Sequence, residues 1–314
     1  MIRTLLVATA LCLSAPALAK TITVEAGEEA QERLQEALIL AEPGDVVAIG
    51  AGKFDLTDGL SLDVDKVTIQ GAGADKSVLS FAGQLGAGEG LRVTSDDVVL
   101  RDFAIEDSKG DGIKSKGANR IVYHGLRVEW TEGPKPTNGA YGIYPVESRD
   151  VLVQDSFVRG ASDAGIYVGQ SENIIVRRNT VVQNVAGIEI ENSFDAEVTE
   201  NLATANTGGI LVFDLPNLPK MGGHNVLVAR NAVIGNNTDN FAPEGNIVAG
   251  VPAGTGVMVM ANRNVLVEEN ALINNGRANV MIDAYTQKFD DKTYDPIPQF
   301  VAVSDNFHSR AGFA

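Results

Sequence analysis

A unit that recurs about every 22 residues is the feature that most constrains what this chain can fold into. The anchor glycines Gly142, Gly165, Gly187 and Gly209 are 23, 22 and 22 residues apart, and an aliphatic residue follows each of them. An Asn or Asp and a Val-rich alternating run come later in the unit, as in AGIEIENSFDAEVTEN. Alternation predicts short strands, because alternate side chains of a strand point to the same face. Such units stack into a solenoid.

The repeat predicts an all-β fold, a single-stranded parallel β-helix with about nine to ten coils of three strands each. A leucine-rich repeat has a similar period, but these units are rich in Val, Ile, Asn and Gly rather than Leu. Recurring asparagines predict a stacked amide ladder at one corner, at Asn179, Asn201, Asn231 and Asn270. The aliphatic residues after the anchors predict one inward column, made of Ile143, Ile166, Ile188, Ile210, Val257 and Val280.

Residues 1–19, MIRTLLVATALCLSAPALA, are predicted to be a secretory signal peptide. They contain an early Arg3, an apolar run too short to span a membrane and a small-residue end. The segment also holds the single cysteine of the sequence, Cys12. We therefore expect a periplasmic or secreted chain with no membrane span, no disulfide and no thiol chemistry after cleavage.

The remainder is predicted to form a short N-terminal region and one long solenoid. Residues 20–53 should contain a strand and a capping helix, because apolar residues recur at helical spacing until Pro43-Gly44. Residues 54–314 should form the β-helix itself. Three intervals exceed the length of a regular coil and predict loops that rim the glycine-anchored sheet, at 128–140, 213–224 and 236–255.

The residues predicted to point outward from the glycine-anchored sheet form a strip suited to a sugar. Lys114, Tyr144, Tyr167 and Glu189 each lie two positions after an anchor, and Glu191 lies four positions after one. Stacked tyrosines can pack on pyranose faces, while charged groups can bind hydroxyls and carboxylates. Ordinary cross-strand stacking on an exposed sheet is the alternative reading. The predicted substrate-binding set is completed by Lys116, Trp130, Glu147 and Asp214.

The net charge and its distribution along the chain indicate which ligands it could bind. The chain has a net charge of −16, which disfavours nucleic acid as a partner. One coil reverses this sign, with basic side chains at Lys109, Lys114, Lys116, Arg120 and Arg127. That reversal could receive an acidic polysaccharide, or it could simply balance an acidic neighbouring coil.

Glu189 and Glu191 are two residues apart on one predicted strand, so they share a face. They could act as an acid and base pair, or bind Ca²⁺ together with Asp163, although a Ca²⁺ site usually has more oxygen ligands. The apolar Leu211, Phe213, Met258 and Met260 continue the same outward strip. We expect the second and third loops to fold over these four residues; a docking partner is the alternative.

The order of a capping helix followed by coils resembles the pectate-lyase superfamily of right-handed parallel β-helices. The segment YGIYPVES (141–148) is similar to the catalytic Tyr-Gly-Ile-Asp-Pro-His-Asp of mannuronan epimerases, with Tyr144 and Val146 in place of Asp and His. Lyase or epimerase chemistry on a uronate would use Tyr141 or Tyr144 as base or acid. Lys114 or Arg120 would neutralise the uronate carboxylate.

A closer resemblance, over nearly the whole predicted mature chain, is to a family of exported bacterial parallel β-helix repeat proteins. The segments ASDAGIYVGQSENIIVRRN and GGILVFDLPNLP carry it. That family has no established activity, and its genes often neighbour a dihaem c-type cytochrome. The leading hypothesis is binding of an extended acidic polysaccharide along the glycine-anchored sheet. The alternatives are a polysaccharide lyase or epimerase, and a periplasmic interaction protein of an electron-transfer system with a c-type cytochrome partner.

Overall fold

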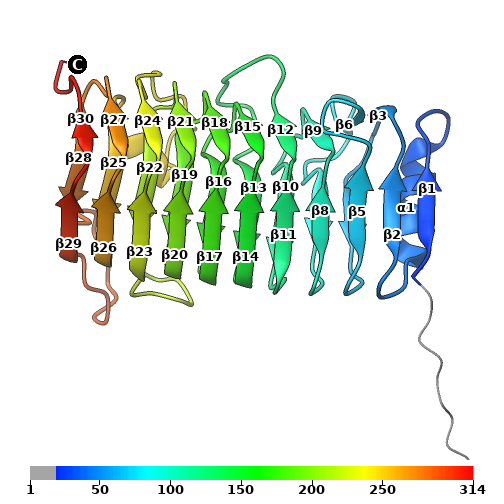
Figure 1. The fold of residues 1–314 in the computed structure, drawn as a ribbon, viewed down its shortest axis with the longest axis horizontal. Helices are drawn as coiled ribbons and strands as arrows, with labels where there is room; N and C mark the ends of the chain where they lie inside the picture. The colour runs from blue at the N-terminus through cyan, green and yellow to red at the C-terminus, as the bar shows by residue number, and fades with distance from the viewer. Residues whose placement is uncertain (1–18, 314) are drawn as a thin grey trace, which may run out of the picture.

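A computed structural model describes residues 19–313 of the chain, which wind into one elongated right-handed parallel β-helix (Figure 1). Three parallel sheets run along it, and they confirm the predicted fold class. The 11-stranded sheet is called sheet A, the 10-stranded sheet is sheet B and the 9-stranded sheet is sheet C. The predicted signal peptide, with Arg3 and Cys12, lies outside the described residues apart from Ala19, so it stays a prediction.

The strands are short because each coil turns sharply at its corners. Sheet A contains β1 (Thr21–Val24), β2 (Val46–Ile49), β5 (Thr68–Gly71), β8 (Val99–Arg101), β11 (Ile121–His124), β14 (Arg149–Gln154), β17 (Glu172–Arg177), β20 (Phe194–Thr199), β23 (His224–Ala229), β26 (Arg263–Glu268) and β29 (Gln299–Ser304). Sheet B contains β3 (Gly52–Asp55), β6 (Ser77–Ser80), β9 (Ala104–Glu106), β12 (Arg127–Glu129), β15 (Phe157–Arg159), β18 (Thr180–Val182), β21 (Leu202–Thr204), β24 (Ala232–Ile234), β27 (Ala271–Ile273) and β30 (Phe307–His308).

Sheet C is the glycine-anchored sheet of the sequence repeat. It contains β4 (Leu60–Leu62), β7 (Leu91–Val93), β10 (Ile113–Lys116), β13 (Tyr141–Val146), β16 (Ala164–Gly169), β19 (Ala186–Glu191), β22 (Gly208–Phe213), β25 (Thr255–Met260) and β28 (Ala278–Asp283). Its register places Ile143, Ile166, Ile188, Ile210, Val257 and Val280 in one column, as predicted. The first five of these side chains are fully buried in the core.

Buried asparagines stack along two corners of the solenoid. The Nδ2 of Asn179 donates to the Oδ1 of Asn201 at 3.0 Å, and Asn201 donates in the same way to Asn231 at 3.0 Å. A second ladder, which the sequence analysis did not identify, continues from Asn184 to Asn206 at 3.0 Å. These amides also bond to main-chain groups that the turns would otherwise leave unpaired.

The helix α1 (Ala30–Leu40) covers the N-terminal end of the solenoid, as the capping prediction requires (Figure 1). It buries Ala30, Leu34, Ala37 and Leu38 against the first coil. The solenoid nevertheless begins earlier than residue 54, because β1 and β2 already pair within sheet A. No helix within residues 19–313 is both long and apolar enough to cross a membrane.

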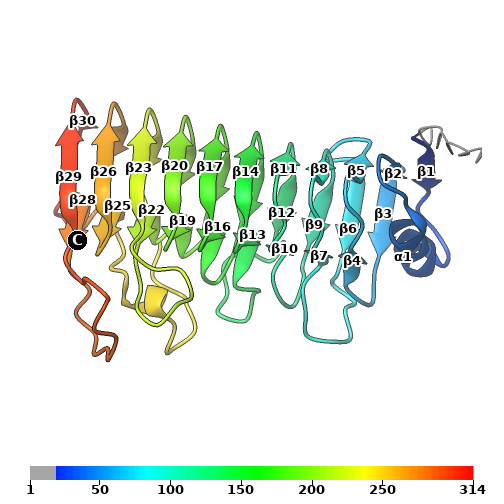
Figure 2. The same cartoon turned by 90° about the horizontal axis from the view of Figure 1, so that it is seen from below.

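The long loops lie on one side of the solenoid; loop 130–140 joins β12 to β13, and the others gather beside β22, β25 and β28 (Figure 2). Their observed bounds are 130–140, 214–223 and 235–254, because β12 extends to Glu129 and the flanking strands include Phe213, His224 and Thr255. The third loop contains the short 3₁₀ helix η1 (Ile247–Gly250). A further loop at 284–298, which the repeat spacing did not predict, joins β28 to β29. Loops 214–223, 235–254 and 284–298 together are called the roof.

Candidate functional site

A pocket of about 420 Å³ lies on sheet C, where the roof meets β13, β16 and β19. The sheet supplies acidic and aromatic side chains, and the roof supplies apolar side chains, amides and one lysine. The pocket is lined by Ala140, Tyr141, Asp163, Glu189, Glu191, Leu215, Pro216, Asn217, Leu218, Asn246, Ile247, Val248, Tyr285 and Lys288. The side-by-side arrangement of the three roof loops, seen in Figure 2, therefore encloses a concave site on an otherwise open sheet.

The roof buries the apolar part of sheet C. Leu211, Phe213, Met258 and Met260 are 0%, 1%, 7% and 9% exposed, and they pack in a cluster with Leu215, Val248, Val251 and Tyr294 from the roof. The prediction that loops fold over these residues is confirmed, and the fourth loop contributes as well. The alternative of an exposed docking patch is wrong in this structure, because the roof already covers all four side chains.

Three carboxyl side chains meet at the floor of the pocket. Glu189 and Glu191 alternate along β19 and so point to the same face, while Asp163 lies at the corner just before β16. All three residues are buried: Asp163 is 7% exposed, Glu189 is 2% exposed and Glu191 is 9% exposed. The hydroxyl of Tyr167 donates a hydrogen bond of 2.8 Å to Oε1 of Glu191. Oε2 of Glu189 is buried and has no hydrogen-bond partner.

Burial shifts the protonation of all three carboxyl groups in the same direction. Burial, reinforced by the charges of Glu191 and Asp111, raises the pKa of Asp163 to about 7. Burial also raises the pKa of Glu189 well above its usual value, and the charges of Asp163 and Glu191 add to this. The pKa of Glu191 is raised by burial too, although the hydrogen bond from Tyr167 opposes this shift. The floor therefore retains protons at a pH where exposed carboxyls are ionised.

A tyrosine cluster stands beside the carboxyl groups. The ring centroids of Tyr141 and Tyr144 are 4.4 Å apart, and those of Tyr141 and Tyr167 are 4.6 Å apart. The absence of a side chain at Gly169 lets the Tyr167 ring lie over its own strand, because a β-carbon there would clash with the ring. Tyr141 faces the pocket, whereas Tyr167 is buried beneath it. Burial first, and nearby carboxylates second, raise the pKa of both Tyr141 and Tyr144.

Most cations of the basic coil have acidic partners. The Nζ of Lys114 lies 3.3 Å from Glu89 and 3.4 Å from Asp111, besides 4.8 Å from the Tyr144 ring centroid. Lys116 pairs with Glu147 at 3.2 Å. Lys114 and Lys116 thus have acidic partners, as the charge-balance interpretation predicted, whereas the Nζ of Lys109 donates to the backbone carbonyl of Leu85 at 3.4 Å.

Arg120 and Arg127 lie away from the tyrosines. Arg120 directly precedes β11 of sheet A and binds Asp97 at 2.6 Å, while Arg127 on sheet B binds Glu106 at 2.9 Å. The predicted pairing of Arg120 with Tyr141 or Tyr144 in one catalytic site is therefore wrong, because the corner between the sheets turns its guanidinium toward Asp96 and Asp97.

Three further predicted binding residues do not line the pocket. Trp130 is buried, and its indole Nε1 donates to the carbonyl of Ser108 at 2.7 Å. Glu147 is exposed and paired with Lys116. Asp214 is buried in the roof, where its carboxylate accepts the backbone N–H groups of Gly222 and Gly223 at 3.0 and 2.9 Å. Trp130 and Asp214 therefore shape loops rather than line the pocket.

A calcium site at Glu189, Glu191 and Asp163 stays a prediction. Carboxylate oxygens suit Ca²⁺, which usually takes about six to eight oxygen ligands from carboxylates, carbonyls and water together. Among residues 19–313 no group of three or more His, Cys, Asp or Glu side chains has a metal-holding arrangement. A bound divalent cation would have to bring further oxygen ligands, such as water, to this floor.

Sequence reasoning missed the residues that the roof contributes. Tyr285 and Lys288 come from the loop at 284–298, for which no later anchor glycine exists to reveal an excess length. The available signal was composition, because this segment combines aromatics, charges and the prolines Pro296 and Pro298 between two regular strands. Asn217 and Asn246 lay within predicted loops, but nothing in the repeat indicated which loop residues would face the sheet.

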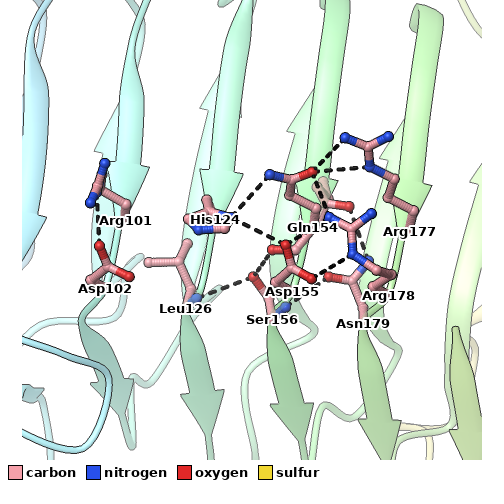
Figure 3. Close-up of polar contacts among 11 residues, drawn as sticks. Arg101, Asp102, His124, Leu126, Gln154, Asp155, Ser156, Arg177, Arg178 and Asn179 are labelled. Carbon is pink, nitrogen blue, oxygen red and sulfur yellow. Dashed lines mark hydrogen bonds and ion pairs between the residues drawn. The ribbon is translucent and has the colours of Figure 1, made fainter. Parts of the chain in front are cut away.

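Polar residues also gather at the edge of sheet A, where the neighbouring strands β11, β14 and β17 end (Figure 3). The Nε of Arg178 donates to Oδ1 of Asp155 at 2.8 Å, and Arg177 donates to Gln154 at 3.0 Å. His124 lies 3.4 Å from Asp155. Every group in this cluster has a partner of complementary charge or polarity, so it is a surface network that stabilises neighbouring coils.

The comparisons with known proteins agree with this geometry. Residues 58–233 match the family described as "Right handed beta helix region", which is more than half of the chain. The chain belongs to this right-handed beta-helix family. No curated protein sequence matches it.

Solved structures of other right-handed beta-helix proteins resemble the chain at low sequence identity. An exopolygalacturonase from Thermotoga maritima has a TM-score of 0.64 at 10% identity, over 90% of this chain and 80% of the other. The A-module of the Azotobacter vinelandii mannuronan C-5 epimerase AlgE4 has a TM-score of 0.58 at 13% identity, over 90% and 85%. A family 28 exopolygalacturonase from Yersinia enterocolitica has a TM-score of 0.52 at 12% identity, over 94% and 67%. These likenesses show the fold, the right-handed parallel β-helix that the resemblance implied.

Proposed function

We propose that this beta-helix protein binds the end of a glycan in the roofed pocket on sheet C. The observation that carries the proposal is the lining of that pocket. Tyr141 and Tyr285 offer aromatic faces, Asn217 and Asn246 offer amides, and the carboxyl floor offers acceptors and donors for sugar hydroxyls. Sugar sites combine such flat apolar surfaces with a few convergent polar groups.

The covering of part of sheet C favours binding of one end of a glycan over binding of an extended glycan along the whole sheet. Beyond Glu189, the next strands of the sheet are covered by the roof, so a polymer has no open path in that direction. On the other side Tyr144, Lys114 and Arg92 stay partly or fully exposed in neighbouring strands. We therefore place the terminal sugar in the pocket and the following sugars over this strip.

The charges of the pocket do not favour the polyuronate that the basic coil suggested. Lys114 and Lys116 are already paired with acids, and the pocket floor itself carries carboxyl groups. The structural relatives named above are called a mannuronan epimerase and exopolygalacturonases, which supports a glycan ligand in general terms. We propose a glycan without carboxylates in the pocket-bound sugar.

Calorimetric titration against neutral, amine-bearing and uronate oligosaccharides tests this function. Replacing Tyr141 with Ala should weaken binding of the preferred glycan at least tenfold, because an aromatic wall of the pocket is lost. The matched control is Phe157→Ala on sheet B, which should leave affinity unchanged. If Tyr141→Ala binds every oligosaccharide as tightly as the parent chain does, the pocket is not the site.

Hydrolysis of a glycosidic bond is a second candidate function. Cleavage of that bond needs one carboxylic acid to protonate the leaving oxygen and a second carboxylate as base or nucleophile. Asp163, with its pKa raised to about 7, is suited to the acid role beside Glu189 and Glu191. A reducing-sugar assay on the bound glycan tests this candidate, and Asp163→Asn should lower kcat by about a hundredfold or more.

Lyase or epimerase chemistry has weaker support. Tyr141 and Tyr144 would have to lose a proton to act as bases, yet burial and neighbouring acids raise the pKa of both. An absence of unsaturated uronate products across polyuronates would retire this alternative. Export to the periplasm or beyond and a c-type cytochrome partner remain predictions, and co-purification with such a cytochrome would test the latter.

A further inference from the structure

The lining of the pocket has more acidic than basic side chains. Asp163, Glu189 and Glu191 converge on its floor, and Lys288 is the one basic residue among the lining residues that the structure describes. Lys288 is exposed, so solvent screens its charge at the rim. Two nearby acids do not add to this excess, because Lys114 pairs with Asp111 and the backbone N–H groups of Gly222 and Gly223 donate to Asp214. The buried floor of the pocket therefore has acidic side chains without a basic partner among the lining residues.

An unpartnered oxygen marks the place where a donor is missing. Oε2 of Glu189 is fully buried, belongs to a pocket-lining residue and accepts no hydrogen bond from any described group. Its neighbour Glu191 already accepts from Tyr167 through Oε1. A buried polar atom without a partner costs free energy, and that cost is recovered when a ligand supplies the donor.

We infer that the pocket binds a sugar with a free amine, a hexosamine whose ammonium group lies against Glu189, Glu191 and Asp163. This inference deepens the proposed glycan binding and rests on it. An ammonium group has three N–H donors and one positive charge. It can therefore donate to Glu189 Oε2 and to the neighbouring carboxylates at once, and it offsets their mutual repulsion.

The remaining walls suit the rest of such a sugar. Tyr141 and Tyr285 present rings for the pyranose face, and an aromatic face close to a cation adds a favourable cation–π contribution. Leu215 and Val248 exclude water from the same space, which strengthens the attraction between ammonium and carboxylate. A uronate carboxylate would meet like charge here, and an N-acetyl group would bring neither charge nor three donors.

The test compares sugars that differ only at one substituent. Oligomers of β-1,4-linked glucosamine, of N-acetylglucosamine and of glucose share a backbone and differ at carbon 2, and galactosamine and N-acetylgalactosamine form a second pair. Calorimetry should show that an amine-bearing member binds at least tenfold tighter than its acetylated and hydroxyl partners. Equal or tighter binding of an acetylated or hydroxyl member overturns the inference and leaves glycan binding standing.

Charge-neutralising variants connect that preference to the floor. Glu189→Gln and Glu191→Gln should each reduce affinity for the amine sugar at least tenfold while changing affinity for the acetylated sugar less than threefold. Glu197→Gln, an exposed position on β20 of sheet A, is the matched control and should change neither affinity. Thermal unfolding of each variant shows that it is folded. Equal losses for both sugars in the pocket variants would contradict the assigned ammonium position.

Two further measurements distinguish a site for an amine sugar from a general cation site. Lys288→Gln should tighten amine binding about two- to threefold at low salt, because it removes the rim cation that opposes the ammonium. Spermidine and CaCl₂ are titrated alone. Binding of either as tight as that of the amine sugar would show a general cation site and overturn the sugar assignment. If no saccharide of the panel binds, the inference and the proposed function both fall.

Discussion

Carboxyl groups occupy two opposite environments in this solenoid. At the edge of sheet A where β14 ends, Asp155 lies 2.8 Å from Arg178 and 3.4 Å from His124, and these partners hold its pKa below the usual value (Figure 3). In the pocket on sheet C, Asp163 and Glu189 have no Arg or His in the described lining, and their pKa values are raised. Both regions arise from the same repeat, so the strand geometry alone does not set their chemistry.

The contrast shows which charged clusters stabilise the fold and which provide a site. A cluster in which every charge is paired and partly solvated stabilises neighbouring coils modestly and needs no ligand. A cluster of buried acids without cations is held in place by the surrounding structure at a cost in stability. That cost is the reason to assign function to the pocket and not to the sheet A network.

The difference between the pocket carboxyls and the sheet A carboxyls should have its largest effect on the pH dependence of stability. Because the folded pKa of Asp163 is raised to about 7 from 3.8, the folded state binds more protons than the unfolded state between these values. The free energy of unfolding should therefore fall as pH rises from about 4 to 7, by about 4 kcal/mol at most from this group. Asp163→Asn should flatten that decline in urea titrations taken at several pH values.

Asp155→Asn is the control for that experiment. The folded pKa of Asp155 is lowered, mainly by its hydrogen bond to Arg178, so its contribution is present above pH 4 and is lost in acid. Its removal should lower stability by less than about 1 kcal/mol and leave the slope between pH 4 and 7 unchanged. Identical slopes for the parent chain and Asp163→Asn would remove the difference between the two regions.

A second prediction concerns the unpartnered oxygen of Glu189. Glu189→Gln replaces a buried acid with a neutral group of the same size, so it should raise the free energy of unfolding at pH 8 by about 1–3 kcal/mol. Glu197→Gln, on the exposed face of β20, should change it by less than about 0.5 kcal/mol. A less stable Glu189→Gln chain, measured by urea unfolding, would mean that the carboxyl is satisfied in the protein without a ligand.

A third prediction sharpens the role of the roof in creating the pocket environment. The hydroxyl of Tyr294 donates to the carbonyl of Asp214 at 2.5 Å and so ties loop 284–298 to loop 214–223. Tyr294→Phe should cost about 1 kcal/mol locally and make loop 284–298 several times more sensitive to limited proteolysis. Tyr285→Phe, in the same loop, is the matched control and should leave the rate of cleavage unchanged, because the hydroxyl that it removes takes no part in the bond from Tyr294 to Asp214.

The smallest effect is expected on sheet A. Arg178→Ala removes an ion pair whose guanidinium side chain is 41% exposed, so stability should fall only slightly and the loss should shrink in high salt. Glycan affinity should not change. A large loss of glycan binding in this variant, measured by calorimetry, would show that the polar network on sheet A is itself a ligand surface.

The sequence by itself determined the solenoid, the strand registers and the face on which key side chains lie. Glu189 and Glu191 could be placed together on one face of β19, and Tyr167 beside Glu189, because alternation and a 22-residue period are properties of neighbouring units. The Asn179 ladder followed from the same regularity. The same regularity did not determine which acids pair with Lys114 and Lys116, because several acids lay within reach of each lysine.

Only the tertiary structure decided that this face is a pocket rather than an open strip. The roof is built from irregular loops whose contacts join distant parts of the chain, as the bond from Tyr294 to Asp214 across 80 residues illustrates. A repeat pattern carries no information about such contacts, since each depends on one particular loop conformation. Yet they exclude water from Glu189 and Asp163, and this exclusion shifts the protonation of these groups and determines what they can bind.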